Sequence, residues 1–290
     1  MRQQRNFWIV GGDQRQCALA RALSEDGHEV HTYALEQETD LPSAEPGLAG
    51  IQEAHCVILP LPALDGELVN TPLSDLHLPL SALLDALRPG QLLCGGMLSP
   101  AFLAQAESRG LTAVDYFARE ELAVANSIPS SEGAIQIAME ELPITLHGAR
   151  VAVIGAGRLG KTLCWQLRGL GAHVTLCARK YADLAWAQVW GCDAAPSDRL
   201  GPWLAGFDLV INTVPSLLLG REALGELKPG CLVIDLASKP GGVDFEAAGE
   251  LGVKVIWALS LPGKVAPVTA GLAIRDTLYN ILTEERVTYD

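Results

Sequence analysis

The sequence has little positive charge, and none of that charge is clustered. The chain carries 21 lysines and arginines against 34 aspartates and glutamates, a formal net charge of −13 at pH 7. Without a Lys/Arg-rich run, such a chain is a poor partner for nucleic acid or for an anionic membrane, and we expect neither. An acidic protein that binds an acidic small molecule must concentrate its few cations at the site, so isolated basic residues in loops become candidates.

Long apolar runs and metal-binding patterns are also missing. No apolar run approaches the roughly 20 residues of a membrane span, and residues 7–10 are too short for the core of a signal peptide. The seven cysteines are scattered, and no pair has the spacing of a zinc site or a redox motif. We interpret them as buried core residues in a reducing compartment. The six histidines lie outside the loops discussed below. We therefore expect a cytoplasmic protein with no metal site.

The chain does contain the material for two α/β domains. Its 290 residues are 49% hydrophobic, and short apolar runs alternate with amphipathic stretches, a pattern typical of parallel sheets with crossover helices. We expect two doubly wound, Rossmann-like domains with parallel sheets, joined by helices around a cleft. Residues 1–130 would form a Rossmann-like or flavodoxin-like substrate domain. Residues 131–290 would bind NAD(P), with the C-terminal helix packing back toward the first domain.

The predicted elements follow the alternation of apolar and amphipathic segments. Ser130 and Ser131 can cap a boundary helix that ends near Leu142, and residues 267–285 are expected to form a long final helix. Strands are predicted at 7–10, 29–33, 56–59, 91–94, 112–115, 150–154, 173–177, 209–213, 231–235 and 254–257. The other helices are predicted at 14–25, 80–87, 100–108, 158–170, 181–189, 221–227 and 245–251.

One glycine-rich loop stands in the context that a dinucleotide site requires. It runs Gly155-Ala156-Gly157-Arg158-Leu159-Gly160, directly after a predicted strand and at the start of a helix. Gly155 permits the tight turn, Gly157 lets the backbone approach a pyrophosphate, and Gly160 allows close packing of helix on strand. The helix N-terminus adds unpaired N–H groups and positive potential. The loop predicts a bound dinucleotide.

The residues at the end of the next strand indicate which dinucleotide the protein binds. NAD sites place a carboxylate there for the ribose 2′-hydroxyl, whereas this chain has Arg179 and Lys180, which suit a 2′-phosphate. The sequence favours NADP, with NAD as the alternative. The alternative without a ligand is that Arg179 and Lys180 are simply a solvated basic pair at the end of the strand. A later strand ends in Thr213, Val214 and Pro215, which we expect to line the ribose and nicotinamide.

Polar and cationic residues in four loops are candidates for a substrate site. Arg15, Lys239 and Lys264 form a small cationic set that suits an anion bearing carboxylates. Asp13 and Ser130 can equally be helix caps, and Lys239 can be a solvated turn residue. The candidate catalytic residues are Asp13, Asp235 and Lys239. The candidate substrate-binding residues are Arg15, Asn126, Ser127, Ser130, Ser238, Lys239, Gly241 and Lys264.

Taken together, these segments resemble the A subunit family of dipicolinate synthase. The resemblance runs over nearly the whole chain, and two of its segments are more specific than the glycine loop, which many dehydrogenases share. These two are Asn126–Pro129 and the turn around Pro240. The full set comprises residues 11–15, 126–129, 132–133, 155–160, 212–216, 235–242 and 261–267.

The resemblance implies synthesis of pyridine-2,6-dicarboxylate in the mother cell of a sporulating bacterium. It implies NADP-dependent dehydrogenation of a dihydrodipicolinate-level intermediate, with the flavoprotein-like B subunit of dipicolinate synthase as partner. We also expect a homo-oligomer. The substrate would lie between the lobes, with its carboxylates held by Arg15, Lys239 and Lys264, and much of the catalysis would be positioning. Two alternatives stay open. One is an NADP-dependent dehydrogenase of another carboxylate, such as a shikimate-like or hydroxy-acid-like substrate; the other is a non-catalytic nucleotide-binding scaffold.

Overall fold

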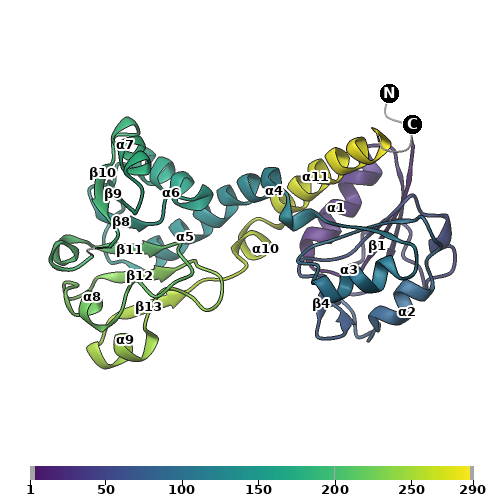
Figure 1. The fold of residues 1–290 in the computed structure, drawn as a ribbon, viewed down its shortest axis with the longest axis horizontal. Coiled ribbons are helices and arrows are strands. Elements are labelled where there is room, and N and C mark those ends of the chain that lie inside the picture. Colours follow the sequence, from purple (N-terminus) through teal and green to yellow (C-terminus); the bar gives the residue numbers. More distant parts are fainter. Residues whose placement is uncertain (1–3, 199, 288–290) are drawn as a thin grey trace. The chain divides into compact units, whose positions relative to one another are not determined.

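The computed structural model describes residues 4–198 and 200–287 and separates into two compact units. Unit 1 is Met1–Asn126 together with Ala266–Asp290, and unit 2 is Ser127–Val265. Each unit contains a parallel sheet flanked by helices (Figure 1). The predicted α/β class with two parallel sheets is confirmed. The division falls at residue 126, and the final helix belongs to unit 1.

The sheet of unit 1 has the strand order β2-β1-β3-β6-β7, and all of its pairs are parallel. Apart from the small hairpin β4-β5, this is the flavodoxin-like order, which changes direction between β1 and β3. The strands are β1 (Asn6–Val10), β2 (Glu29–Tyr33), β3 (Cys56–Ile58), β4 (Leu64–Asp65), β5 (Leu68–Val69), β6 (Leu92–Gly95) and β7 (Thr112–Asp115). The helices are α1 (Gln14–Glu25), α2 (Leu80–Asp85), α3 (Pro100–Glu107), α4 (Glu120–Ala125) and α11 (Pro267–Val287).

Both faces of this sheet are covered by helices, which explains why its strands read as continuous apolar runs. Phe7 and Ile9 of β1 face one cluster, which includes residues of α1, α4 and α11. Trp8 and Val10 face the opposite cluster, which includes residues of α2 and α3. Successive residues of one strand therefore enter two different cores.

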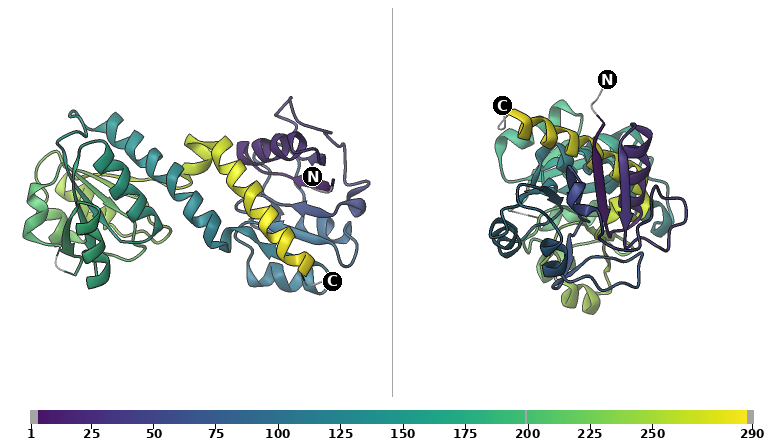
Figure 2. Two further views of the ribbon diagram at one scale, coloured as in Figure 1. Left: turned by 90° about the horizontal axis from the view of Figure 1, so that it is seen from above. Right: turned by 90° about the vertical axis from the view of Figure 1, so that its right-hand side faces the viewer.

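Helix α11 completes unit 1 although it lies at the other end of the chain. Its buried residues Ile274, Leu278, Ile281 and Leu282 recur at helical spacing and join the core that contains α1. The two helices lie side by side in both orientations of the molecule (Figures 1 and 2). Further along α11, Glu284 receives two hydrogen bonds from Arg119, at 2.6 and 2.7 Å.

Unit 2 has the strand order β10-β9-β8-β11-β12-β13, again with parallel pairs. This is the Rossmann order, and it changes direction between β8 and β11. The strands are β8 (Arg150–Ile154), β9 (His173–Ala178), β10 (Asp193–Pro196), β11 (Leu209–Asn212), β12 (Leu232–Asp235) and β13 (Lys254–Trp257). The helices are α5 (Ser127–Glu141), α6 (Arg158–Gly169), α7 (Tyr181–Val189), α8 (Arg221–Gly225), α9 (Phe245–Leu251) and α10 (Leu261–Val265).

One predicted helix start is wrong. Helix α5 begins at Ser127, so Ser130 and Ser131 lie inside it instead of capping it. Pro129 is tolerated because it sits in the first helical turn, where its missing N–H would have had no partner. The predicted burial of the cysteines is confirmed, since all seven are buried and free. Among the described residues, no helix is long and apolar enough to cross a membrane, and no cluster of metal ligands is present.

Candidate functional site

The loop between β8 and α6 forms a tight turn in which glycine is required. Gly155 has a φ of +107°, and its N–H donates to the Cys177 carbonyl at 2.8 Å. A Cβ atom on Gly160 would lie 1.9 Å from the Gly155 carbonyl oxygen, so α6 can start this close only with glycine there. Thr213 closes the turn from β11, because its Oγ1 donates to the Ile154 carbonyl at 2.9 Å.

Gly157 is the point at which the loop has free space. It is the N-cap of α6, with no side-chain cap, and a Cβ atom there would meet no protein atom within 4 Å. Packing within the protein therefore does not require glycine at this position, whereas a ligand approaching the backbone would. Of the remaining loop residues, Arg158 is exposed, Ala156 is half-buried, and Leu159 packs against the core. The loop fits a bound pyrophosphate at the helix N-terminus.

The end of β9 presents two cations and no carboxylate. Arg179 and Lys180 are exposed, and neither side chain forms a hydrogen bond or ion pair with the described residues. Tyr181 follows them at the start of α7 and is 88% exposed. Within the described chain, the guanidinium of Arg179 is thus available to an anion from outside the protein.

Two fully buried polar side chains hold the loops that follow β11 and β12. Asn212 donates through Nδ2 to Asp235 Oδ1 at 2.8 Å and to the Val214 carbonyl at 3.0 Å. The Val214 N–H returns a hydrogen bond to Asn212 Oδ1 at 3.1 Å. The Asp235 carboxylate also accepts from the backbone N–H groups of Ala237, at 3.1 Å, and Gly242, at 2.8 Å. With three donors around it and no exposed surface, Asp235 is placed to hold backbone.

The other predicted substrate residues of unit 2 fall into separate groups. Ser238 and Lys239 are exposed in one turn with the buried Gly241, whose N–H donates to the Ser238 carbonyl at 2.8 Å. Lys264 is exposed on a different element, the short helix α10. Pro215 is exposed beyond the end of β11. The structure thus brings the residues of the Pro240 turn together, while Lys264 belongs to another segment.

The residues around the start of α5 serve packing. Ser127 is 5% exposed, and its Oγ lies 2.7 Å from Thr162 Oγ1 of α6. Ser130 is partly buried within α5. Asn126 ends α4 as its C-cap, with its N–H donating to the Leu122 carbonyl at 2.8 Å. The hydroxyl of Ser127 is therefore engaged by a neighbouring helix.

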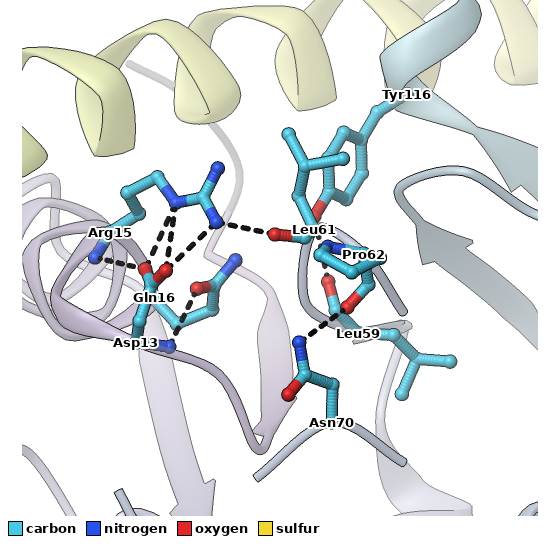
Figure 3. A network of polar contacts seen from close by, with 8 residues as sticks. All are labelled: Asp13, Arg15, Gln16, Leu59, Leu61, Pro62, Asn70 and Tyr116. Atoms are coloured by element: carbon cyan, nitrogen blue, oxygen red, sulfur yellow. Dashed lines mark hydrogen bonds and ion pairs between the residues drawn. The ribbon is translucent and has the colours of Figure 1, made fainter. Parts of the chain in front are cut away.

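In unit 1 the loop after β1 brings Asp13, Arg15 and Gln16 together (Figure 3). Asp13 caps α1 by accepting from the Arg15 N–H at 2.9 Å, and its carboxylate also binds the Arg15 side chain through Nε, at 2.9 and 3.2 Å, and Nη2, at 2.8 Å. Arg15 Nη2 also donates to the Leu61 carbonyl. Arg15 is 8% exposed, so this is a nearly buried cation whose charge Asp13 partly offsets.

The segment that follows β3 is held in place beside these residues. Tyr116 is fully buried and donates through its hydroxyl to the Leu59 carbonyl at 2.9 Å. Burial raises the pKa of Tyr116 well above its usual value, so the hydroxyl stays a neutral donor. Asn70 Nδ2 donates to the Pro62 carbonyl at 3.1 Å. Hydrogen bonds from Arg15, Asn70 and Tyr116 thus reach three carbonyls of the Leu59–Pro62 segment (Figure 3).

Comparisons with known proteins agree with this arrangement. Residues 6–117 match the family described as the N-terminal domain of the dipicolinate synthase A subunit, and residues 122–284 match the alanine dehydrogenase/PNT C-terminal domain. The A subunit of dipicolinate synthase from Bacillus subtilis (strain 168) is 34% identical over 291 residues, which cover 95% of each chain. The chain belongs to the dipicolinate synthase A subunit family. The resemblance predicted from the sequence is thereby confirmed.

Solved structures of this family share the whole fold. The Bacillus halodurans A subunit structure matches with a TM-score of 0.87 and 31% identity, covering 96% of this chain and 97% of that chain. A transhydrogenase from Sinorhizobium meliloti matches with a TM-score of 0.71, at 96% and 93% coverage. Its 19% identity shows a common fold and nothing more. Gln16 and Tyr116, which lie around the Leu59–Pro62 segment (Figure 3), were not among the residues predicted from the sequence; the signal for Gln16 was its place three residues after the cap Asp13.

Proposed function

We propose that this chain is an NADP-dependent oxidoreductase that converts a dihydrodipicolinate-level intermediate to dipicolinate, with the B subunit of dipicolinate synthase as its partner. The observation that carries the proposal is the match to the A subunit of Bacillus subtilis, which extends over 95% of both chains. The geometry of unit 2 supports it, because a glycine turn with free space at Gly157 suits a dinucleotide pyrophosphate.

For the cofactor we propose NADP. The Gly155–Gly160 loop would hold the pyrophosphate, and Thr213, Val214 and Pro215 would line the ribose and nicotinamide. Arg179 would bind the 2′-phosphate bidentately, and Lys180 would add a point charge. The absence of a carboxylate at the end of β9 supports NADP over NAD.

The proposed reaction removes one hydride and one proton from the dihydropyridine ring and leaves an aromatic dicarboxylate. The nicotinamide cofactor, when bound, accepts the hydride. The proton is released to solvent, so the products are dipicolinate, NADPH and H⁺. Because the product is aromatic, the step needs no strong base, and the protein contributes mainly by positioning the substrate.

The residues suggested by the sequence take different roles in this proposal. Lys239 and Lys264 are exposed cations of unit 2, and Arg15 is the nearly buried cation of unit 1; each would bind a substrate carboxylate. Asp13 and Asp235 would be positioning residues, since their carboxylates are occupied by Arg15 and by the Pro240 turn.

The test is an oxidation assay with the purified protein, NADP⁺ and freshly made product of dihydrodipicolinate synthase, with and without the B subunit. We expect the near-ultraviolet band of NADPH to grow together with the absorbance of dipicolinate. Activity only with the B subunit would identify the protein as a nucleotide-binding partner. No activity in either case, with NADP⁺ binding shown separately, would contradict the proposed substrate. Arg15→Ala should weaken substrate binding, and unchanged turnover would remove Arg15 from the site.

A further inference from the structure

Among the described residues of unit 1, the buried N–H donors Trp8 Nε1 and Gln16 Nε2 have no hydrogen-bond partner, and only that of Gln16 lies at the turn between β1 and α1. Gln16 is fully buried, and its Oε1 accepts from the Asp13 N–H at 3.1 Å, which fixes the side-chain amide. Its Nε2 is left with no hydrogen bond among the described residues. A buried, unpaired N–H group destabilises a folded protein, and native structures nearly always supply an acceptor. The missing acceptor for Gln16 must then come from outside the chain.

The side-chain amide of Gln16 points toward the guanidinium of Arg15 (Figure 3). Nε2 points toward the Arg15 guanidinium and the Leu61 carbonyl (Figure 3). Arg15 donates through Nε and Nη2 to Asp13 and Leu61, and its Nη1 has no partner in the described chain. Gln16 Nε2 and Arg15 Nη1 are therefore both left without acceptors among the described residues; Nη2 faces the Leu61 carbonyl, and Nη1 lies on the other side of the guanidinium (Figure 3).

Their position in the fold is the one at which open α/β sheets bind ligands. The loops after β1 and β3 carry these residues, and the strand order of unit 1 changes direction between β1 and β3. Ligands of such sheets bind at this switch point, outside the carboxyl ends of the strands. The first turn of the 12-residue helix α1 adds positive potential there.

We propose that the Gln16 Nε2 and the Arg15 guanidinium together bind one carboxylate of the substrate, one oxygen each. This assignment rests on the proposed function, which supplies a small dicarboxylate. Because both groups are nearly or fully buried, the proposal requires the Leu61–Pro62 segment to move when the carboxylate binds. Gln16 is thus a substrate-binding residue in its own right, in addition to its part in the cap of α1.

The choice of glutamine over glutamate supports this role. Either residue, three positions after a cap, can accept from the backbone N–H of the cap residue, so the cap does not require an amide. Only glutamine has an N–H donor, Nε2, at the position where glutamate has its second carboxylate oxygen. Gln16→Glu therefore keeps the cap and converts the donor into an anionic acceptor.

The experiment measures dipicolinate binding by calorimetry to the full chain saturated with NADP⁺. We expect Gln16→Glu to weaken binding by more than about 10-fold, and the neutral Gln16→Met by about 5-fold, because a hydrogen bond to a charged group is lost in both. Gln105→Glu adds the same charge at an exposed position of α3 and should bind dipicolinate as the wild type does. NADP⁺ affinity should stay unchanged in all three variants, because the proposed NADP⁺ site lies in unit 2, and an unchanged circular dichroism spectrum would show that unit 1 is folded.

The outcomes separate this inference from the proposed function. If Gln16→Met binds dipicolinate as tightly as the wild type, the inference is wrong, and a buried water satisfies the amide; a loss confined to Gln16→Glu would then be charge repulsion alone. If the wild type oxidises its substrate but the variants bind normally, the function stands without this site. If the wild type binds dipicolinate through Gln16 but oxidises nothing, the carboxylate site stands and the function fails. A wild type that does neither contradicts both.

Discussion

The two units build the same turn with opposite chemistry. In each, a five-residue strand ends, three residues follow, and a 12-residue helix begins: β1 and α1 in unit 1, β8 and α6 in unit 2. Counting along the turn, Asp13 stands where unit 2 has Gly157, and Gln16 stands where it has Gly160. Unit 2 leaves the helix N-terminus open, whereas unit 1 closes it with a carboxylate cap and a buried amide.

This difference determines which anion each turn suits. An uncapped helix N-terminus with space beside it can receive a bulky phosphate group on its backbone N–H groups. In unit 1 the Asp13 side chain already caps the helix N-terminus, and it also binds the Arg15 guanidinium, whose Nη2 donates to the Leu61 carbonyl. In the proposed function, one strand-turn-helix plan therefore serves nucleotide recognition in unit 2 and recognition by side chains in unit 1.

We expect the largest effect from a substitution that gives helix α6 of unit 2 the carboxylate cap found on α1 of unit 1. Gly157→Asp should reduce NADP⁺ affinity by at least about 100-fold, or about 2.7 kcal/mol, because its carboxylate would compete with the pyrophosphate. Thermal stability should not fall, since a Cβ atom at Gly157 meets no protein atom. Fluorescence titration with NADPH measures the effect. Gly225→Asp, at an exposed and equally open position of α8, is the matched control and should bind normally.

A second change tests the close approach of α6 to its strand. In Gly160→Ala the new Cβ atom would lie 1.9 Å from the Gly155 carbonyl oxygen, so the helix must move. We expect a loss of about 2 kcal/mol in the free energy of unfolding, typical of an overpacked site. Urea unfolding measures it, with Gly157→Ala as the control. Equal stability of the two variants would show that the third glycine has no packing role.

The next largest expected effect is on the preference for NADP⁺ over NAD⁺. Arg179→Ala should lower NADP⁺ affinity by about 10-fold, because the bidentate contact to the 2′-phosphate is lost. NAD⁺ has no 2′-phosphate and serves as the internal control, so its affinity should change by less than about 2-fold. If both affinities fall together, or neither does, Arg179 does not select the cofactor.

The sequence predicted the sheets better than the details of the sites. Strands such as Arg150–Ile154 are buried on both sides, so an apolar run alone marks them. Edge strand Asp193–Pro196 was not predicted because it is short, mostly exposed and contains proline. The start of α5 was misplaced because Pro129 sits inside its first turn. The roles of Gln16 and Asp235 depend on which atoms of one side chain meet which donors. That is settled by three-dimensional packing and has no counterpart in residue spacing.

The smallest effect concerns the ion pairs that attach α11 to the rest of unit 1. Arg119 bonds Glu284 of α11 and also Glu121, and these hydrogen bonds lower the pKa of both carboxyl groups. Arg119→Gln should lower the Tm by no more than about 2 °C near pH 6, because exposed ion pairs contribute little.

The pH dependence of this small effect has a definite sign. Groups whose folded-state pKa is depressed contribute stability above their unfolded pKa, about 4.3 for glutamate, and lose it as pH falls through the folded value. The difference in Tm between wild type and Arg119→Gln should therefore shrink toward zero by about pH 3. Arg88→Gln is the control, since the Arg88 side chain donates to the Gln52 carbonyl and forms no ion pair with the described residues, so its effect should not vary with pH in this window. A difference that persists in acid would mean that Arg119 holds α11 by packing of its side-chain stem and not by charge.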